Sequence, residues 1–133
     1  MEYKMHELAY SNEHDQPAFL SAEEASFFRQ TSERIKQLLN IAIEIKPYNH
    51  DNVTGHENAL GIYYRADDGS DMITIDNYFI HECYEVEHCG RYPIESETLT
   101  GAICHEIAHR RYLRHTKHHA ALTQQYINAV SVV

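Results

Sequence analysis

One short segment restricts the fold of this chain more than any other feature. Residues 104–119 read CHEIAHRRYLRHTKHH, and no Asp or Glu follows Glu106 anywhere in the sequence. The run His105-Glu-Ile-Ala-His109 matches the pattern H-E-x-x-H, which has chemical meaning only on a helix. The fold must therefore place a helix here, with histidines on one of its faces.

Helical geometry brings the two histidines of this pattern to one ion. Four residues of helix separate His105 and His109 by about 40° around the axis and about 6 Å along it. Glu106 then projects beside the ion, where a carboxylate can take the proton of a bound water. We expect the two histidines to be metal ligands and Glu106 to be a catalytic general base.

A catalytic zinc site needs a third protein ligand and leaves its fourth position to water. Since Glu106 is the last acidic residue, the downstream candidates are His115, His118 and His119. Geometry favours His115, but on one unbroken helix it would lie about 15 Å from the first ligand. The helix must therefore break between residues 110 and 116. We expect His118 and His119 to be solvated helix residues, with each in reserve as the third ligand.

The same segment resembles a known family. It looks like the motif of the SprT-like, WLM and YgjP-like zinc metallopeptidases, in which H-E-L-x-H is followed by five residues and then by H-S-x-x-F-W-x-L. The matching parts of this chain are the H-E-x-x-H motif, the five residues after it, His115-Thr-Lys, Ala121-Leu122 and Tyr126. The chain departs from that pattern at His119-Ala120, where relatives carry an aromatic pair. The likeness covers roughly residues 20–130, and only residues 104–126 are specific.

This resemblance implies a zincin-like endopeptidase that acts on a protein or peptide substrate, with Zn²⁺ held by His105, His109 and His115 and with Glu106 as the base. It also implies that the hairpin strand around 72–76 borders the substrate cleft and pairs with an extended peptide. Some relatives act on proteins crosslinked to DNA. The alternative function is a catalytically latent, zinc-stabilised protein-interaction module, in which a side chain fills the fourth coordination position.

Composition and charge set the class of protein. With 133 residues and 43% hydrophobic residues, the chain is long enough for one core and one domain. A formal net charge of −9 disfavours nucleic-acid binding, so the DNA association of the family is not expected here. A local basic patch stays possible around Arg110, Arg111, Arg114 and Lys117.

The surroundings of the protein can also be predicted. No run approaches the eighteen or so apolar residues that span a bilayer, so no membrane association is expected. Three cysteines lie at no disulfide-framework spacing, and the N-terminus lacks a signal-peptide pattern. A cytoplasmic, intracellular location is therefore favoured.

Local patterns predict an α+β, zincin-like single domain, with a small sheet and helices packed on one of its faces. Residues 1–20 are expected as a loose or docked N-terminal tail, and residues 21–133 as the domain. Ser21 and Glu24 form a capping box that begins a helix, and Thr116 caps the last one. The expected helices are 22–39, 77–89, 94–112 and 117–130; the expected strands are 41–46, closed by Pro47, and 60–65 and 72–76, joined by a turn at Asp68-Gly69.

Several other residues could take part in chemistry. Tyr112 and Tyr126 are candidates to stabilise a tetrahedral oxyanion, whereas Cys104 is expected to be a small buried core residue. The pairs His81/Cys83 and His88/Cys89 contain ligand types, but their spacing fits no structural zinc pattern. In the N-terminal tail, any one of four residues could cap the metal in an inhibited form: His6, Glu7, His14 and Asp15.

Overall fold

The computed structural model describes residues 4–9, 20–88 and 98–131 of the chain. These residues form an α+β fold, as the sequence predicts. In chain order, the elements are β1 (Lys4–Ala9), α1 (Ala22–Leu39), β2 (Glu44–Tyr48), the 3-10 turn η1 (His50–Asn52), β3 (Ala59–Arg65), β4 (Asp71–Asp76), α2 (Asn77–His88), α3 (Leu99–Ala108) and α4 (Lys117–Ser131).

The strands form one mixed sheet in the order β1-β3-β4-β2. β3 pairs antiparallel with β1 and with β4, whereas β2 pairs in parallel with β4. The predicted hairpin is present, and Gly69 supplies the positive φ of 89° at its turn. The expectation that the edge around 72–76 pairs with a substrate strand is wrong, because β2 already covers that edge of β4.

Two strands differ from the sequence prediction. β2 begins at Glu44 rather than 41, and Pro47 lies inside it instead of closing it. A proline is tolerated there because β2 is an edge strand of the described sheet, where a missing N–H breaks no second ladder. Residues 4–9, expected within a tail, are the other edge strand, β1.

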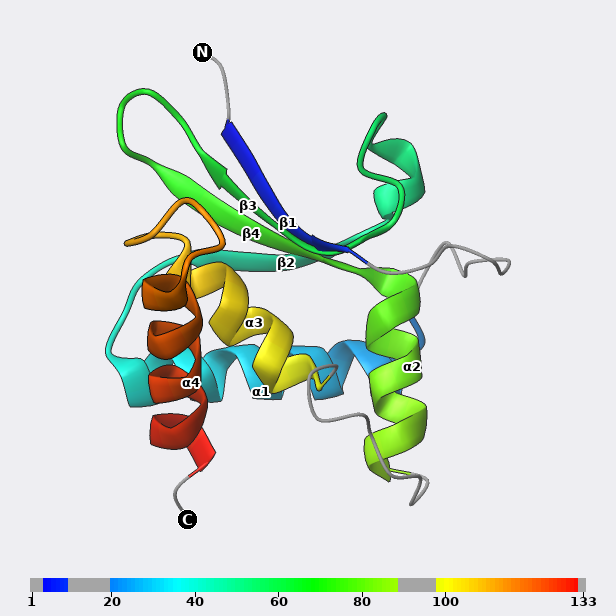
Figure 1. Cartoon of the computed structure of the whole chain (residues 1–133). Coiled ribbons are helices and arrows are strands. Elements are labelled where there is room, and N and C mark those ends of the chain that lie inside the picture. The colour runs from blue at the N-terminus through cyan, green and yellow to red at the C-terminus, as the bar shows by residue number, and fades with distance from the viewer. Residues whose placement is uncertain (1–3, 10–19, 89–97, 132–133) are drawn as a thin grey trace.

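All four described helices lie on one face of the sheet (Figure 1). The main core lies between them and includes Tyr63 and Ile73 from the strands, Ile35 from α1 and Ile103 from α3, each at 0% exposure. A smaller cluster on the opposite face contains Ala59, Ile62 and Tyr64. α3 contacts β1, β3, β4 and the other helices, so the motif helix lies at the centre of the packed layer.

Two helix boundaries confirm the local signals. α1 begins after Ser21, whose hydroxyl accepts from Glu24 N at 3.1 Å while Glu24 Oε1 accepts from Ser21 N at 2.8 Å. This is the predicted capping box. Asn40 then ends the helix in the left-handed conformation, with a φ of 53°.

Candidate metal centre

The motif helix is shorter than predicted. α3 begins at Leu99, directly after its N-cap Thr98, whose Oγ1 accepts from Gly101 N at 2.9 Å. It ends at Ala108 with His109 as its C-cap, so the helix stops before Tyr112. The predicted residues 94–97 lie outside the described residues. The required break is confirmed: the chain turns after His109, and α4 begins at Lys117.

This break brings three imidazoles together. His115 Nε2 lies 3.2 Å from His105 Nε2 and 3.1 Å from His109 Nε2. The ligand atoms of all three residues lie within 4.8 Å of one another, and the described residues contain no other such group. Two nitrogens bound at about 2.0–2.1 Å to a tetrahedral ion are about 3.3 Å apart. These three histidines could therefore hold one metal ion.

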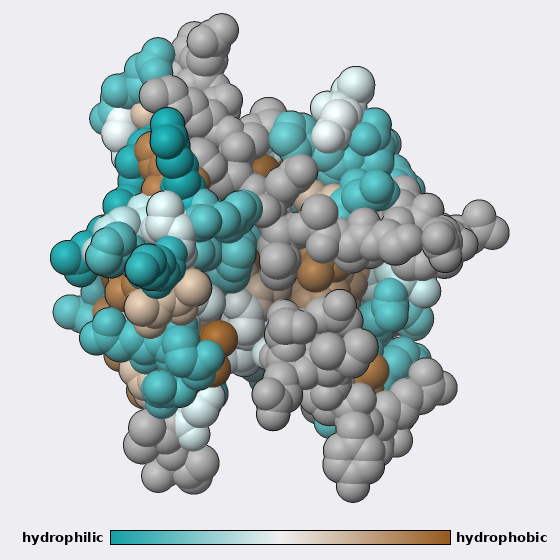
Figure 2. All heavy atoms as spheres, in the orientation of Figure 1, coloured by the Kyte–Doolittle hydropathy of each residue, from teal (hydrophilic) through white to brown (hydrophobic). Residues whose placement is uncertain are grey.

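The site opens to solvent on one side. His109 is fully buried and His105 is partly buried, whereas His115 is exposed. Figure 2 shows a predominantly hydrophilic surface over α4 and the turn before it. An ion at this centre would thus be bound from the protein side and reached from the side of His115.

Hydrogen bonding fixes the tautomer of His109, the buried candidate ligand. His109 Nδ1 lies 2.9 Å from the carbonyl oxygen of Tyr112. Because a carbonyl only accepts, Nδ1 carries the proton, and the Nε2 of a neutral ring presents its lone pair to the centre. Burial, followed by the neighbouring His119, His109 and His115, lowers the pKa of His105 to about 3. A neutral imidazole is the form that binds a metal.

Glu106 lies beside the three imidazoles in a fully buried position. Its Oε2 is 3.9 Å from His105 Nε2. On its other side it packs against β3 at Gly61, where an added Cβ would lie 2.9 Å from Glu106 Cγ and 3.0 Å from its Oε2. A larger residue at position 61 would require the Glu106 side chain to shift. A glycine inside a strand is a signal of close approach, and this signal at Gly61 could have indicated its role from the sequence.

A polar network ties the turn after α3 to the hairpin. Asp71 accepts from Arg110 Nε at 2.8 Å, from Arg110 Nη2 at 2.9 Å and from the Tyr63 hydroxyl at 2.7 Å. Arg110 also donates to the Ala42 carbonyl at 2.8 Å, and Arg65 donates to the Arg110 carbonyl. Burial opposes ionisation of Asp71, but the bonds from Arg110 and Tyr63 outweigh it and lower the pKa of Asp71.

The predicted basic patch is accordingly smaller than expected. Arg110 is paired with Asp71 and is not a free surface charge. Arg111, Arg114 and Lys117 are exposed, as a surface patch requires.

His119 corrects the sequence prediction most clearly. It was expected as a solvated residue, yet it is only 3% exposed. Its Nε2 donates to the His105 carbonyl at 2.9 Å, and its ring stacks on His109 with 4.1 Å between centroids and 21° between planes. It lies three residues before the buried Leu122 and so shares the inward face of α4. His118 is exposed, as predicted, and stacks on Tyr112.

The remaining candidates have ordinary surroundings. Cys104 is at 0% exposure, and burial raises the pKa of its thiol to about 12, so it is a core residue as predicted. Tyr126 packs against the main core, and its oxyanion role, like that of Tyr112, stays a prediction. His81 binds Glu24, and Cys83 is buried. The described residues do not include Cys89, His14 and Asp15, nor the side chains of His6, Glu7 and His88.

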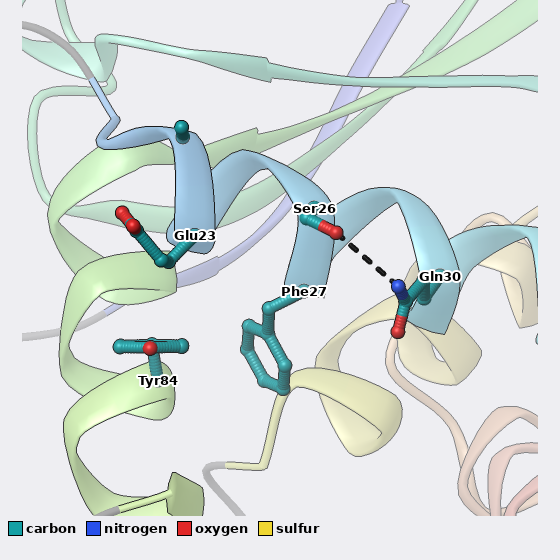
Figure 3. A pocket seen from close by; sticks show the side chains of 6 residues that line it. Glu23, Ser26, Phe27, Gln30 and Tyr84 are labelled. Atoms are coloured by element: carbon teal, nitrogen blue, oxygen red, sulfur yellow. Dashed lines mark hydrogen bonds between the residues drawn. The ribbon is translucent and has the colours of Figure 1, made fainter.

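A separate hollow lies between α1 and α2 (Figure 3). It encloses about 360 Å³, and its lining contains Ala22, Glu23, Ser26, Phe27, Gln30 and Tyr84. The rings of Phe27 and Tyr84 pack edge to face, with 5.8 Å between their centroids. None of the three clustered histidines lines this hollow, so it is distinct from the metal centre.

Comparison with protein-family models, with curated proteins and with solved structures gives no match. The resemblance to the SprT-like metallopeptidases therefore stays a prediction from the residues of the motif. Among the helices described, none is long and apolar enough to cross a membrane.

Proposed function

We propose that the protein is a zinc-dependent metallopeptidase, an endopeptidase that hydrolyses peptide bonds in a protein or peptide substrate. His105, His109 and His115 would hold Zn²⁺, and Glu106 would be the general base. The observation that carries the proposal is the convergence of three imidazoles, whose ligand atoms lie within 4.8 Å of one another, from the end of one helix and the turn after it.

The donor set favours zinc. Imidazole suits zinc, copper, iron and nickel, and three histidines that leave a fourth position to water are a frequent catalytic zinc arrangement. When bound, zinc polarises a carbonyl and lowers the pKa of water to about 7. The α+β architecture, with the motif helix under a mixed sheet, is compatible with the zincin-like fold that forms part of this proposal.

Glu106 supports the catalytic form of the proposal. Its carboxylate oxygen is 3.9 Å from a candidate ligand nitrogen, a distance that supports contact with a water bound to the proposed ion. A buried carboxylate interacts strongly with nearby charge, because few water molecules screen it. Glu106 would accept the proton of the attacking water and pass it to the leaving amine.

The latent-module alternative requires a side chain in the fourth position. The nearest further imidazole, His119, donates its Nε2 proton to the His105 carbonyl and is not in the group of ligand atoms. Within the described residues this leaves a three-histidine centre, which favours an enzyme over a closed structural site.

Metal analysis and a protease assay on Glu106→Gln test the proposal. The wild-type protein should purify with zinc and cleave an unfolded protein substrate. The variant should keep its zinc and lose about 10²–10⁴-fold in turnover. Glu33→Gln, on the exposed side of α1, is the matched control and should cleave normally. Bound zinc without any cleavage by the wild type would favour the latent module, and equal cleavage by Glu106→Gln would refute the assignment of the base.

A further inference from the structure

We infer that His119 is a positioning residue of the metal centre: it holds His105 and His109 in the arrangement that binds the ion, without being a ligand itself. This inference rests on the proposed metal centre but not on peptidase activity. It concerns a position at which the chain departs from the family pattern, so the resemblance does not supply it.

One side chain contacts both histidines of the motif. The His119 ring lies face to face with His109, with 4.1 Å between centroids, and edge to face with His105 at 4.5 Å and 80°. Its Nε2 is 2.9 Å from the His105 carbonyl oxygen. Because a carbonyl only accepts, this nitrogen carries the proton and has no lone pair to offer a metal. His119 is also outside the group of clustered ligand atoms, which contains only His105, His109 and His115 among the described residues.

The hydrogen bond acts where α3 needs a donor. His105 lies in the last turn of the helix, where backbone carbonyls lack donors from a following turn. The bond from His119 satisfies the carbonyl of the residue whose side chain points to the ion. It thereby fixes the backbone from which the His105 imidazole projects.

The same residue connects the third ligand to the other two. His119 lies four residues after His115, in the first turn of α4. Its backbone N–H donates to Thr116 Oγ1 at 3.2 Å, so the cap of α4 and the side chain of His119 are set together. His119 therefore joins the start of α4, which follows His115, to the end of α3, which carries His105 and His109.

A comparison of His119→Ala with His118→Ala tests the inference. His118 is the exposed neighbour of His119 in the same turn of α4. Zinc affinity would be measured by chelator competition on metal-free protein, with the melting temperature of that protein measured alongside. His119→Ala should bind zinc about 10–100-fold more weakly, and His118→Ala should bind it as the wild type does. His119→Phe, which keeps a stacked ring and lacks the N–H donor, should fall between them.

Cobalt substitution separates a positioning residue from a ligand. At saturating Co²⁺, His119→Phe should show the coordination number of the wild type in its visible spectrum, because no ligand is lost. A changed coordination number would overturn the inference, as would wild-type zinc affinity in both His119 variants. If His119→Ala does not fold, the affinity and spectrum of His119→Phe decide the matter. A wild-type protein that binds no zinc would refute the metal centre itself and this inference with it.

Discussion

Two buried histidines lie at opposite ends of the β3–β4 pair, and they differ in the partner of one ring nitrogen, Nε2. His50 and His109 are both at 0% exposure, and each ring places Nδ1 on a backbone carbonyl, at 2.7 Å from Ala59 O and 2.9 Å from Tyr112 O. The Nε2 of His50 meets the Thr74 hydroxyl at 2.8 Å. The Nε2 of His109 meets the Nε2 of His115 instead.

That difference separates a structural histidine from a candidate ligand. A hydroxyl can donate to a neutral imidazole, so the His50 ring is satisfied within the protein. Imidazole nitrogens that face one another cannot all be satisfied by one another's protons, and a shared cation resolves this conflict. The partner of the second nitrogen, rather than burial, distinguishes the two sites.

Each end of β4 carries an aspartate whose carboxylate accepts several hydrogen bonds from neighbouring segments of the chain. Asp76 accepts from the backbone N–H groups of His50, Tyr78 and Phe79, at 3.0, 3.2 and 3.4 Å, and so fixes η1 and the start of α2. Asp71, at the other end, fixes the turn after α3 through Arg110. The candidate metal centre thus lies next to the Asp71 end of β4, whereas Asp76 holds the opposite end.

The largest effect is expected from removal of a candidate ligand. His109→Ala should lower zinc affinity by more than about 100-fold, because loss of a ligand costs more than loss of the group that orients it. His50→Ala should leave the affinity unchanged, since its ring is hydrogen-bonded at the far end of the sheet. Chelator competition on both variants measures this, and equal losses would show that burial alone accounts for the effect.

For stability, in contrast to zinc affinity, the large effect is expected from substitution of His50. His50→Leu should lower the free energy of unfolding by about 2–4 kcal/mol, because it leaves the Ala59 carbonyl and the Thr74 hydroxyl buried without this partner. Urea denaturation of metal-free protein would measure the loss. The zinc content of the folded variant should stay normal, and a variant of wild-type stability would mean that the His50 hydrogen bonds contribute little.

Much of the candidate metal centre could be predicted because it depends on patterns between residues that are close in sequence. The spacing of His105, His109 and His115 required both a helix and a break after it, and the structure has both. The capping box of α1 was readable for the same reason, since its bonds span only three residues. The position of Glu106 next to His105 on this helix also predicted its role as general base, which remains a proposal.

The errors concern contacts between distant parts of the chain. Sequence periodicity could not reveal that β2 covers β4, because strand order depends on the packing of whole elements. It missed the burial of His119, whose partner lies fourteen residues earlier on another helix. Nor did it distinguish His50 from other loop histidines, because Thr74 is far from it in sequence.

A third prediction concerns the frame around the metal centre. Asp71→Asn should destabilise the protein by about 1–2 kcal/mol, a value reduced by the partial exposure of Arg110. The pKa of Asp71 is lowered from 3.8, so its ion pair stabilises the native state above that pH and is lost as the pH falls through the lower, folded value. The stability gap between wild type and variant should therefore be full at pH 7 and shrink below about pH 4.

Urea denaturation across this pH range measures the gap. Asp67→Asn, an exposed carboxylate in the same hairpin turn, is the matched control and should show no such gap. Zinc affinity of Asp71→Asn should also fall, because the turn after α3 is less firmly held. A gap that persists unchanged at low pH would mean that the ion pair is not its source.

The smallest effects are expected from the N-caps of two helices, of which only one, that of α4, lies next to a candidate metal ligand. Ser21→Ala and Thr116→Ala each remove a side-chain oxygen that accepts a backbone N–H, at 3.1 and 3.2 Å, and each should cost about 1 kcal/mol of stability. Only Thr116 lies between His115 and the turn that carries His119, so only its loss should also weaken zinc binding. Since the stability costs are matched, a difference in zinc affinity reports on local order at the centre. Equal affinities in the two variants would mean that the cap of α4 does not help to hold the ligands.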